Sequence, residues 1–271
     1  MKKADDRPHF MEGYVAASDN ELVQEIYRRS DENTRLNKSK AARVEFHTTV
    51  RYIEKYLTSD SRILDIGAGA GEYSLYFSRR GYDVSALELS ENNIRTFKSK
   101  LASDDQLSIV QGNALDLSRY ENQPFDVVLL LGPLYHLHSD TDKLKCISEA
   151  RRVCKESGVI FFGFISNDIV VLTMQQAHAD YLLNGAYDKD TFKLYDFPFV
   201  FHTLARCRTL LKEAGIEILH EIAVDGVSEL IQETINALDD KSYQQYLRYH
   251  FYLCEKPECL GMSNHLLFIG R

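Results

Sequence analysis

Two patterns of apolar residues alternate along the chain. Short unbroken apolar runs, such as residues 127–131, predict strands covered on both faces, whereas apolar residues that recur every three or four positions predict amphipathic helices. The predicted strands are residues 63–66, 84–87, 106–111, 127–131, 159–165, 216–224 and 265–269. Helical stretches separate most of them, and this alternation predicts an α/β fold with a doubly wound, mostly parallel sheet.

Three regions fall outside the alternation. Two amphipathic segments, 19–30 and 39–57, precede the first predicted strand, and residues 228–254 predict two helices before the last strand. Residues 167–201 form an insertion that is helical in its first half and aromatic in its second half. Because an apolar insertion of this length is usually functional, we expect a lid, although a packing embellishment or an oligomer surface fits the same pattern.

The length of 271 residues is ample for one well-buried core, and we expect a single domain over residues 1–271 with a loose leader at 1–13. The predicted core comprises residues 60–166, 202–224 and 264–271, and the predicted cap comprises residues 1–59, 167–201 and 225–263.

Residues 62–90 carry the clearest chemical pattern. A short apolar run breaks into a turn containing Gly67, Gly69 and Gly71, a helical segment follows, and the next apolar run ends on Glu88. In a doubly wound sheet this unit places a ligand over the carboxyl end of the first strand, and the acid after the second strand reaches the hydroxyls of a ribose. The stretch therefore predicts a site for a cofactor that contains a nucleoside.

The glycine spacing narrows the choice of cofactor. A dinucleotide fingerprint has a third glycine where this chain has Glu72. A carboxylate at the start of a helix repels the pyrophosphate that the helix would otherwise attract. This position therefore disfavours a nicotinamide-dependent oxidoreductase.

The stretch instead resembles motif one of the class I S-adenosylmethionine (SAM) methyltransferases. Their cofactor has no phosphate and carries an ammonium and a sulfonium group, so acidic side chains near the turn are favourable. The resemblance implies that Gly67 and Gly69 give room to the methionyl part and that Asp65 lies near its ammonium, directly or through water. It also implies that Glu88 holds the ribose hydroxyls, and that the sheet has seven strands with the last one antiparallel beside the sixth.

The same resemblance extends to later and earlier segments. It implies that Asn113 contacts the exocyclic amine of adenine, where the family often has an acid, and that the backbone of Ala114 contacts the adenine ring, although Gly-Asn is also a common turn pair.

Helices that precede the first strand usually pack over the cofactor in this family, which makes candidates of Tyr14, Tyr27, Arg35 and Arg43. A core position for the tyrosine at 27 and solvated arginines fit the pattern equally well. The complete set expected for the cofactor is Asp65, Gly67, Ala68, Gly69, Glu88, Leu89, Asn113, Ala114, Leu131, Tyr27 and Arg35.

The end of the fourth predicted strand faces the reactive methyl group by topology. Family members that methylate nucleobase amines often have Asn or Asp followed by Pro-Pro there, whereas this chain has Leu131-Gly132-Pro133, which resembles the small-molecule branch. His136 and His138 are candidate bases because imidazole titrates near neutral pH, and Tyr135 is a candidate for orienting the acceptor. A hydrogen-bonded structural histidine is the alternative.

The composition limits the partners. A net charge of −8 disfavours nucleic acid, and no apolar run approaches the ~20 residues of a membrane span. Five cysteines without regular spacing, and no signal peptide ahead of them, predict a reducing cytoplasm. We expect no metal, because the spacing of His250, Cys254, Cys259 and His265 matches no tight zinc pattern.

These observations predict a SAM-dependent methyltransferase that acts on a small-molecule acceptor under a helical lid, with S-adenosylhomocysteine as product, as a monomer or a homodimer. Methylation of RNA or of a protein remains an alternative, as does a SAM-binding protein without transfer activity. The sheet alone does not name the acceptor, because this fold hosts methylation of several kinds of atom.

Overall fold

The computed structural model describes residues 18–29 and 32–271. The predicted leader at 1–13 and the candidate Tyr14 lie outside the described residues. Within them, none of the helices is both long enough and apolar enough to cross a membrane.

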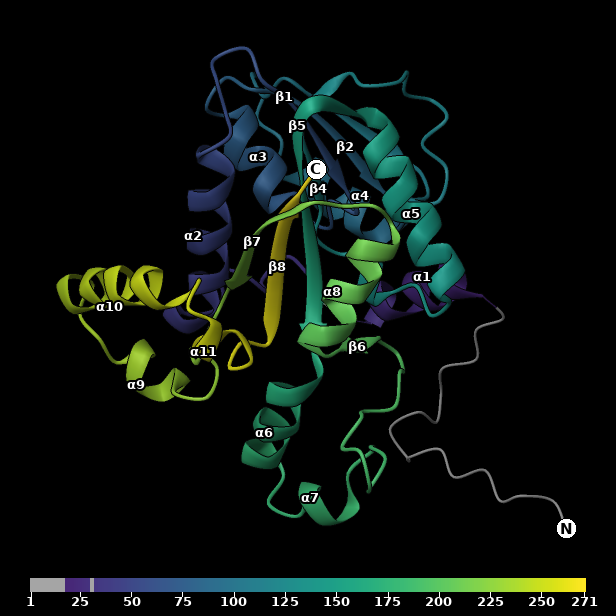
Figure 1. Ribbon diagram of the computed structural model, residues 1–271. Helices are drawn as coiled ribbons and strands as arrows, with labels where there is room; N and C mark the ends of the chain where they lie inside the picture. Colours follow the sequence, from purple (N-terminus) through teal and green to yellow (C-terminus); the bar gives the residue numbers. More distant parts are fainter. Residues whose placement is uncertain (1–17, 30–31) are drawn as a thin grey trace, which may run out of the picture.

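A twisted, mostly parallel sheet forms the centre of the molecule (Figure 1). Its strands are β1 Arg62–Ile66, β2 Asp83–Glu88, β3 Leu107–Gln111, β4 Phe125–Leu130, β5 Cys154–Ser166, β6 Phe201–His202, β7 Ile218–Ala223 and β8 His265–Gly270. Their order is β3-β2-β1-β4-β5-β8-β7, with β8 antiparallel to both of its neighbours. The doubly wound, seven-stranded Rossmann-like sheet is therefore confirmed. The two-residue β6, which pairs with the end of β5, is an addition that the pattern did not predict.

Helices cover both faces of this sheet and extend beyond it. They are α1 Asp19–Arg29, α2 Lys40–Glu54, α3 Glu72–Ser78, α4 Glu91–Ser99, α5 Asp140–Val153, α6 Asn167–Ala177, α7 Tyr181–Asn184, α8 Leu204–Glu213, α9 Gln232–Asn236, α10 Asp240–Leu253 and α11 Pro257–Leu260, with a short 3₁₀ helix at Pro133–Tyr135. One face packs on α2 and α3, through side chains such as Ile53 and Phe77, and the other packs on α5 and α8, through Ile147 and Leu211. Burial of β-strands on both faces explains their unbroken apolar runs.

The fifth strand begins earlier than the predicted range of residues 159–165 and contains an irregularity in its pairing. The pairing of β4 with β5 shifts between Phe125 and Val127, and β5 already begins at Cys154 rather than at residue 159. The apolar pattern therefore located the buried part of β5. It missed the start of the strand, because Lys155 and Glu156 are polar and break the apolar run.

The insertion at residues 167–201 makes a separate small cluster. Its helices α6 and α7 project from one end of the sheet (Figure 1), and Val171, Tyr181, Tyr187 and Leu194 pack together. The returning chain reaches the segment after β4, where the Val200 N–H donates to the Tyr135 carbonyl at 2.9 Å. The insertion is thus anchored beside the end of β4, and its role as a lid stays a prediction.

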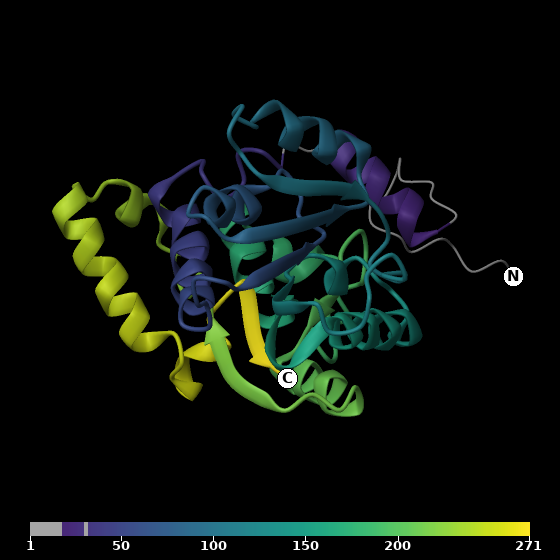
Figure 2. The same ribbon diagram turned by 90° about the horizontal axis from the view of Figure 1, so that it is seen from above.

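Helices α9 and α10 extend the molecule on the outer side of α2. In Figure 2, which looks along a different direction, α10 again lies beyond α2 and away from the sheet. Ile235, Tyr243 and Leu247 pack on Ala41 and Val44 of α2. These contacts hold α2, and hence the residues that it directs toward the sheet, between two apolar layers.

The glycine turn after β1 requires glycine for two different reasons. Gly67, Gly69 and Gly71 all have positive φ values, +72°, +56° and +83°, which side chains rarely tolerate. A Cβ on Gly71 would also overlap the ring of Phe97 from α4. The turn therefore lies close to α4 and directs its backbone over the end of β1.

We expect Gly71→Ala to lower the free energy of unfolding by about 1–3 kcal/mol more than Gly81→Ala. Gly81 is a matched control, because its φ of +88° imposes the same backbone strain while a Cβ there meets nothing within 4 Å. Only the substitution at 71 forces Phe97 to move. Urea denaturation of both variants measures the difference, and equal losses would contradict the contact with Phe97.

Candidate functional site

A cavity lies over the carboxyl ends of β1, β2 and β4, and residues of α1 line one side of it. The complete set expected for the cofactor lines this cavity together with two candidates for catalysis: Tyr27, Arg35, Asp65, Gly67, Ala68, Gly69, Glu88, Leu89, Asn113, Ala114, Leu131, Tyr135 and His136. The candidates Arg43 and His138 do not line it; Arg43 lies over the ring of Phe46, and His138 pairs with Asp19.

Asp65, at the end of β1, is a buried carboxylate. It is 2% exposed, and its Oδ2 accepts the hydroxyl of Ser74 at 2.6 Å. Burial raises the pKa of Asp65 to about 6; the Ser74 hydrogen bond opposes this shift, while the nearby Glu88 adds to it. In the part of the chain that the structure describes, no cationic side chain pairs with Asp65, so its charge is available to a ligand.

Glu88 joins the end of β2 to the glycine turn. Its Oε2 accepts the Gly69 N–H at 2.7 Å, and its Oε1 accepts the Ser90 N–H at 2.8 Å and the Asn93 amide at 3.3 Å. Burial raises the pKa of this carboxyl, and the two backbone hydrogen bonds partly oppose that rise. The carboxylate is therefore held in one position, with one lone pair of Oε2 left to accept a hydroxyl group.

Helix α1 is fastened to the ends of three strands by polar side chains. Asp19 accepts both the backbone N–H and Nδ1 of His138, at 2.8 and 2.7 Å, and Gln24 donates to the Leu89 carbonyl at 2.8 Å. Asn113 donates to Asn20 at 3.1 Å, while its own carbonyl oxygen accepts the N–H of residue 115. One lone pair of the Asn113 side-chain oxygen is therefore left for the predicted contact with adenine.

The end of β4 presents neutral groups to the cavity. His136 is 7% exposed; its Nε2 shares a hydrogen bond of 2.9 Å with the Tyr27 hydroxyl, and its Nδ1 is buried without a partner. Burial lowers the pKa of His136 to about 3, so its imidazole is neutral and a weak base. Burial also raises the pKa of Tyr135, which keeps its phenol protonated.

Arg35 does not reach into the cavity as a free cation. Its guanidinium donates to Glu45 at 2.7 and 3.2 Å and to Glu32 at 2.7 Å. Burial lowers the pKa of Arg35, but Glu45 and Glu32 outweigh this effect and raise it. A ligand that uses Arg35 must therefore share it with these two carboxylates.

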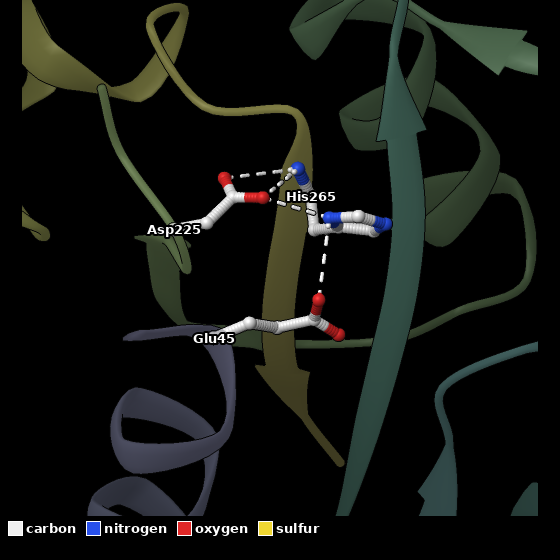
Figure 3. Close-up of side chains that lie close together, drawn as sticks. All are labelled: Glu45, Asp225 and His265. Atoms are coloured by element: carbon white, nitrogen blue, oxygen red, sulfur yellow. Dashed lines mark hydrogen bonds and ion pairs between the residues drawn. The ribbon is translucent and has the colours of Figure 1, made fainter. Parts of the chain in front are cut away.

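Sequence reasoning missed a second cluster, made of Glu45 on α2, Asp225 after β7 and His265 at the start of β8 (Figure 3). His265 Nδ1 lies 2.7 Å from Asp225 Oδ2 and 3.4 Å from Glu45 Oε2. Burial lowers the pKa of His265, but Glu45 and Asp225 outweigh it and raise that pKa to about 9. The three residues come from distant parts of the chain, and no local pattern pointed to them.

The ligand atoms of this cluster lie within 4.8 Å of one another, which is close enough for a metal ion. Without a metal ion, Nδ1 of His265 forms ion pairs with both carboxylates. Of the residues weighed as zinc ligands, His265 belongs to this cluster, whereas His250 bonds to Thr48 and Val224, and Cys254 contacts Tyr52.

A smaller cavity adjoins this cluster. It is lined by Glu45 and Thr49 of α2, Tyr73 of α3, Leu131, Gly163 and Phe164 of β5, Val224, and residues 265–267 of β8. Tyr73 and Leu131 line both cavities. The two spaces therefore adjoin each other at these two residues.

Comparison with known proteins agrees with this geometry. Residues 64–162 match the family model described as a methyltransferase domain. The glycine/sarcosine N-methyltransferase of Aphanothece halophytica is 24% identical over 67% of this chain and 74% of its own length. The ubiquinone biosynthesis O-methyltransferase of Caulobacter vibrioides is 28% identical over 48% of this chain, and the match spans about half of that relative, 52% of its length.

A solved structure shows the same fold at low identity. The magnesium protoporphyrin IX methyltransferase of Synechocystis, with bound S-adenosylhomocysteine, has a TM-score of 0.56 and 12% identity, over 93% of this chain and 99% of its own. The matched family model covers the glycine turn, Glu88 and the end of β4, which are the segments that build the large cavity. Residues 64–162 are therefore similar to a methyltransferase domain, and the chain as a whole shares the fold of that solved methyltransferase.

Proposed function

We propose that this protein transfers a methyl group from SAM to a small-molecule acceptor and releases S-adenosylhomocysteine. The observation that carries the proposal is Asp65, a buried carboxylate that lines the same cavity as the glycine turn and Glu88 and that has no cationic partner among the described residues. A buried carboxylate favours a ligand that brings positive charge. The ammonium of SAM does so, and SAM has no phosphate for Glu72 to repel.

The cavity residues divide into roles along the cofactor. Gly67, Ala68 and Gly69 give backbone room to the methionyl part, Asp65 pairs with its ammonium, and Glu88 accepts the ribose hydroxyls. Leu89, Asn113 and Ala114 line the adenosine end. Leu131, Tyr135 and His136 line the end where the methyl group leaves, and Tyr27 holds His136 by its hydrogen bond.

Methyl transfer from SAM requires mainly that the acceptor atom, the methyl group and the sulfur be aligned. SAM supplies a methyl group already activated toward displacement, so the chain has to orient the acceptor and exclude water; orientation of this kind is worth on the order of 7 kcal/mol or more. The neutral imidazole of His136 and the protonated phenol of Tyr135 add no charge that would compete with the sulfonium. Within residues 18–29 and 32–271 the Tyr135 hydroxyl has no hydrogen-bond partner, which leaves it free to orient an acceptor.

Two observations favour a small acceptor. The reactive end of the large cavity is lined by α1 and the 3₁₀ helix, and Phe199 of the returning insertion packs on His136. A net charge of −8 also opposes a polyanionic substrate such as RNA. The two relatives are named for small-molecule substrates. The match to the second, the ubiquinone biosynthesis O-methyltransferase, spans only about half of that relative's length.

The direct test of the proposal measures S-adenosylhomocysteine release from SAM in the presence of a panel of small amines, phenols and carboxylic acids. We expect release that depends on one class of acceptor. SAM binding without release from any acceptor in the panel would instead identify a SAM-binding protein that transfers nothing, and no binding of SAM would end the proposal.

Glu88→Gln is expected to weaken SAM binding by about 10- to 100-fold, because a neutral amide loses the charge-assisted hydrogen bonds to the ribose hydroxyls. Isothermal titration calorimetry measures the affinity, and Glu91→Gln, an exposed acid on the first turn of α4, is the matched control. Equal affinities for the variant and the wild type would contradict the ribose role of Glu88.

SAM affinity is expected to fall as the pH drops through about 6. Burial raises the pKa of Asp65 to about 6, so the carboxyl is ionised and attractive to an ammonium above that pH and neutral below it. Calorimetric titrations from pH 5 to 8 measure the change. In Asp65→Asn we expect an affinity about 10- to 100-fold lower at pH 7 and flat over this range, since the titrating group is gone; a slope that survives would assign the effect to another residue.

A further inference from the structure

Three side chains from distant parts of the chain point toward one another (Figure 3). They are Glu45 on α2, Asp225 after β7 and His265 at the start of β8. Two carboxylates and one imidazole are donors that divalent transition-metal ions accept. The side chain of Asp225 is 4% exposed and that of Glu45 is 14% exposed, so bulk water has little access to the space between them.

The distances between the donor atoms are close to those of a four-coordinate ion. Zn²⁺ holds nitrogen and oxygen ligands at about 2.0–2.2 Å, which separates the ligand atoms of a tetrahedral site by about 3.4 Å. Nδ1 of His265 and Oε2 of Glu45 are 3.4 Å apart. Nδ1 and Oδ2 of Asp225 are 2.7 Å apart, so this carboxylate has to move when an ion enters.

The smaller cavity beside the cluster supplies a fourth position. Glu45, Tyr73 and His265 line it, and it has room for about one water molecule. Tyr73 is 8% exposed, and within residues 18–29 and 32–271 its hydroxyl is buried without a hydrogen-bond partner, although it lies beside Thr49. A buried hydroxyl in that state is destabilising, and a water molecule bound to an ion would give it a partner.

Negative charge around the cluster favours an ion with two positive charges. Glu45 shares the guanidinium of Arg35 with Glu32, so one cation serves two carboxylates. Glu229 adds a further carboxylate beside the cluster, where the exposed Lys38 offsets it in part. Charged groups away from water are stable when they are paired or bind a metal ion.

Hydrogen bonds hold both carboxylates of the cluster in position. Arg35 donates to both oxygens of Glu45, at 2.7 and 3.2 Å, and the hydroxyl of Ser263 donates to Asp225. Carboxylates that bind metal ions are commonly oriented by such outer hydrogen bonds. Two of the three donors are therefore oriented before an ion arrives.

We propose that Glu45, Asp225 and His265 bind one divalent transition-metal ion with the geometry of Zn²⁺, and that a water molecule in the smaller cavity is its fourth ligand. His265 binds through Nδ1, and the proton that Nδ1 carries in the metal-free protein passes to solvent as the ion enters. The ion joins α2 to the segments that lead from β7 and into β8. Because Glu45 also holds Arg35, the ion fixes a residue that lines the large cavity.

The sequence predicted no metal because the spacing of residues 250–265 matches no tight zinc pattern. Of the residues in that comparison, His265 is the one that takes part here, and its two partners come from α2 and from the segment after β7. Spacing along the chain therefore does not test this site.

The test measures the binding of Zn²⁺ and of Mg²⁺ to protein stripped of metal with EDTA, by isothermal titration calorimetry, for the wild type, His265→Gln, Glu45→Gln and two controls. The first control is His220→Gln, because His220 also pairs with a carboxylate, Glu255 at 2.7 Å, but lies outside both cavities. The second is Cys259→Ser, because the other four cysteines are buried and Cys259 is the more accessible thiol. Circular dichroism checks that each variant folds.

We expect the wild type and both controls to bind one equivalent of Zn²⁺ and to bind Mg²⁺ more weakly, because Mg²⁺ requires octahedral coordination by oxygen. In His265→Gln and Glu45→Gln the affinity for Zn²⁺ falls at least about 100-fold, since loss of a ligand costs more than the roughly 10- to 100-fold effect of losing an outer hydrogen bond. Zn²⁺ at about 100 times its Kd raises the melting temperature of the wild type by about 5–10 °C and leaves that of His265→Gln unchanged.

No binding of Zn²⁺ to the wild type overturns the inference, as does binding that survives in both His265→Gln and Glu45→Gln or that is lost in Cys259→Ser. X-ray absorption at the zinc edge of the loaded wild type decides the question without any variant. Nitrogen and oxygen ligands at about 2.0–2.2 Å support the site, and sulfur at about 2.3 Å overturns it. These measurements are made without SAM, so a negative result leaves the proposed function intact.

Discussion

The neighbouring strands β1 and β2 each end in a buried carboxylate, and the rest of the site depends on where those two groups lie. Parallel strands end at the same edge of a sheet, so Asp65 and Glu88 are brought together without any direct bond between them. Glu88 then holds the backbone of the glycine turn through Gly69, and the turn in turn packs on Phe97 of α4. Negative charge is thus concentrated in a space that excludes phosphate and favours an ammonium.

The same arrangement separates two electrostatic environments. On the cofactor side, Asp65 has no cation beside it within residues 18–29 and 32–271, and His136 and Tyr135 are neutral. Beside the smaller cavity, Glu45 and Asp225 form ion pairs with the imidazole of His265. The two cavities therefore differ in the charge that surrounds them, although Tyr73 and Leu131 line both.

Local patterns were sufficient for the sheet and for the lining of the large cavity. Strands buried on both faces leave unbroken apolar runs, and the turn after β1 needs glycines that the sequence displays directly, so Asp65, Gly67 and Glu88 were predictable by position. The pairing of Arg35 with Glu45 was not, because it depends on how the turn before α2 meets that helix. The cluster around His265 was also out of reach, since Asp225 and His265 become neighbours only when β8 enters between β5 and β7.

The position of β8 in the sheet also orders how the site can be assembled. Every residue that lines the large cavity lies at or before Leu137, whereas His265 opens the strand that joins β5 to β7. During synthesis on the ribosome, the groups for the cofactor therefore emerge long before His265. In a nascent chain that lacks β8, the edge of β5 that pairs with β8 has no partner strand. The smaller cavity forms only when β8 adds to the sheet, because residues of β8 line it.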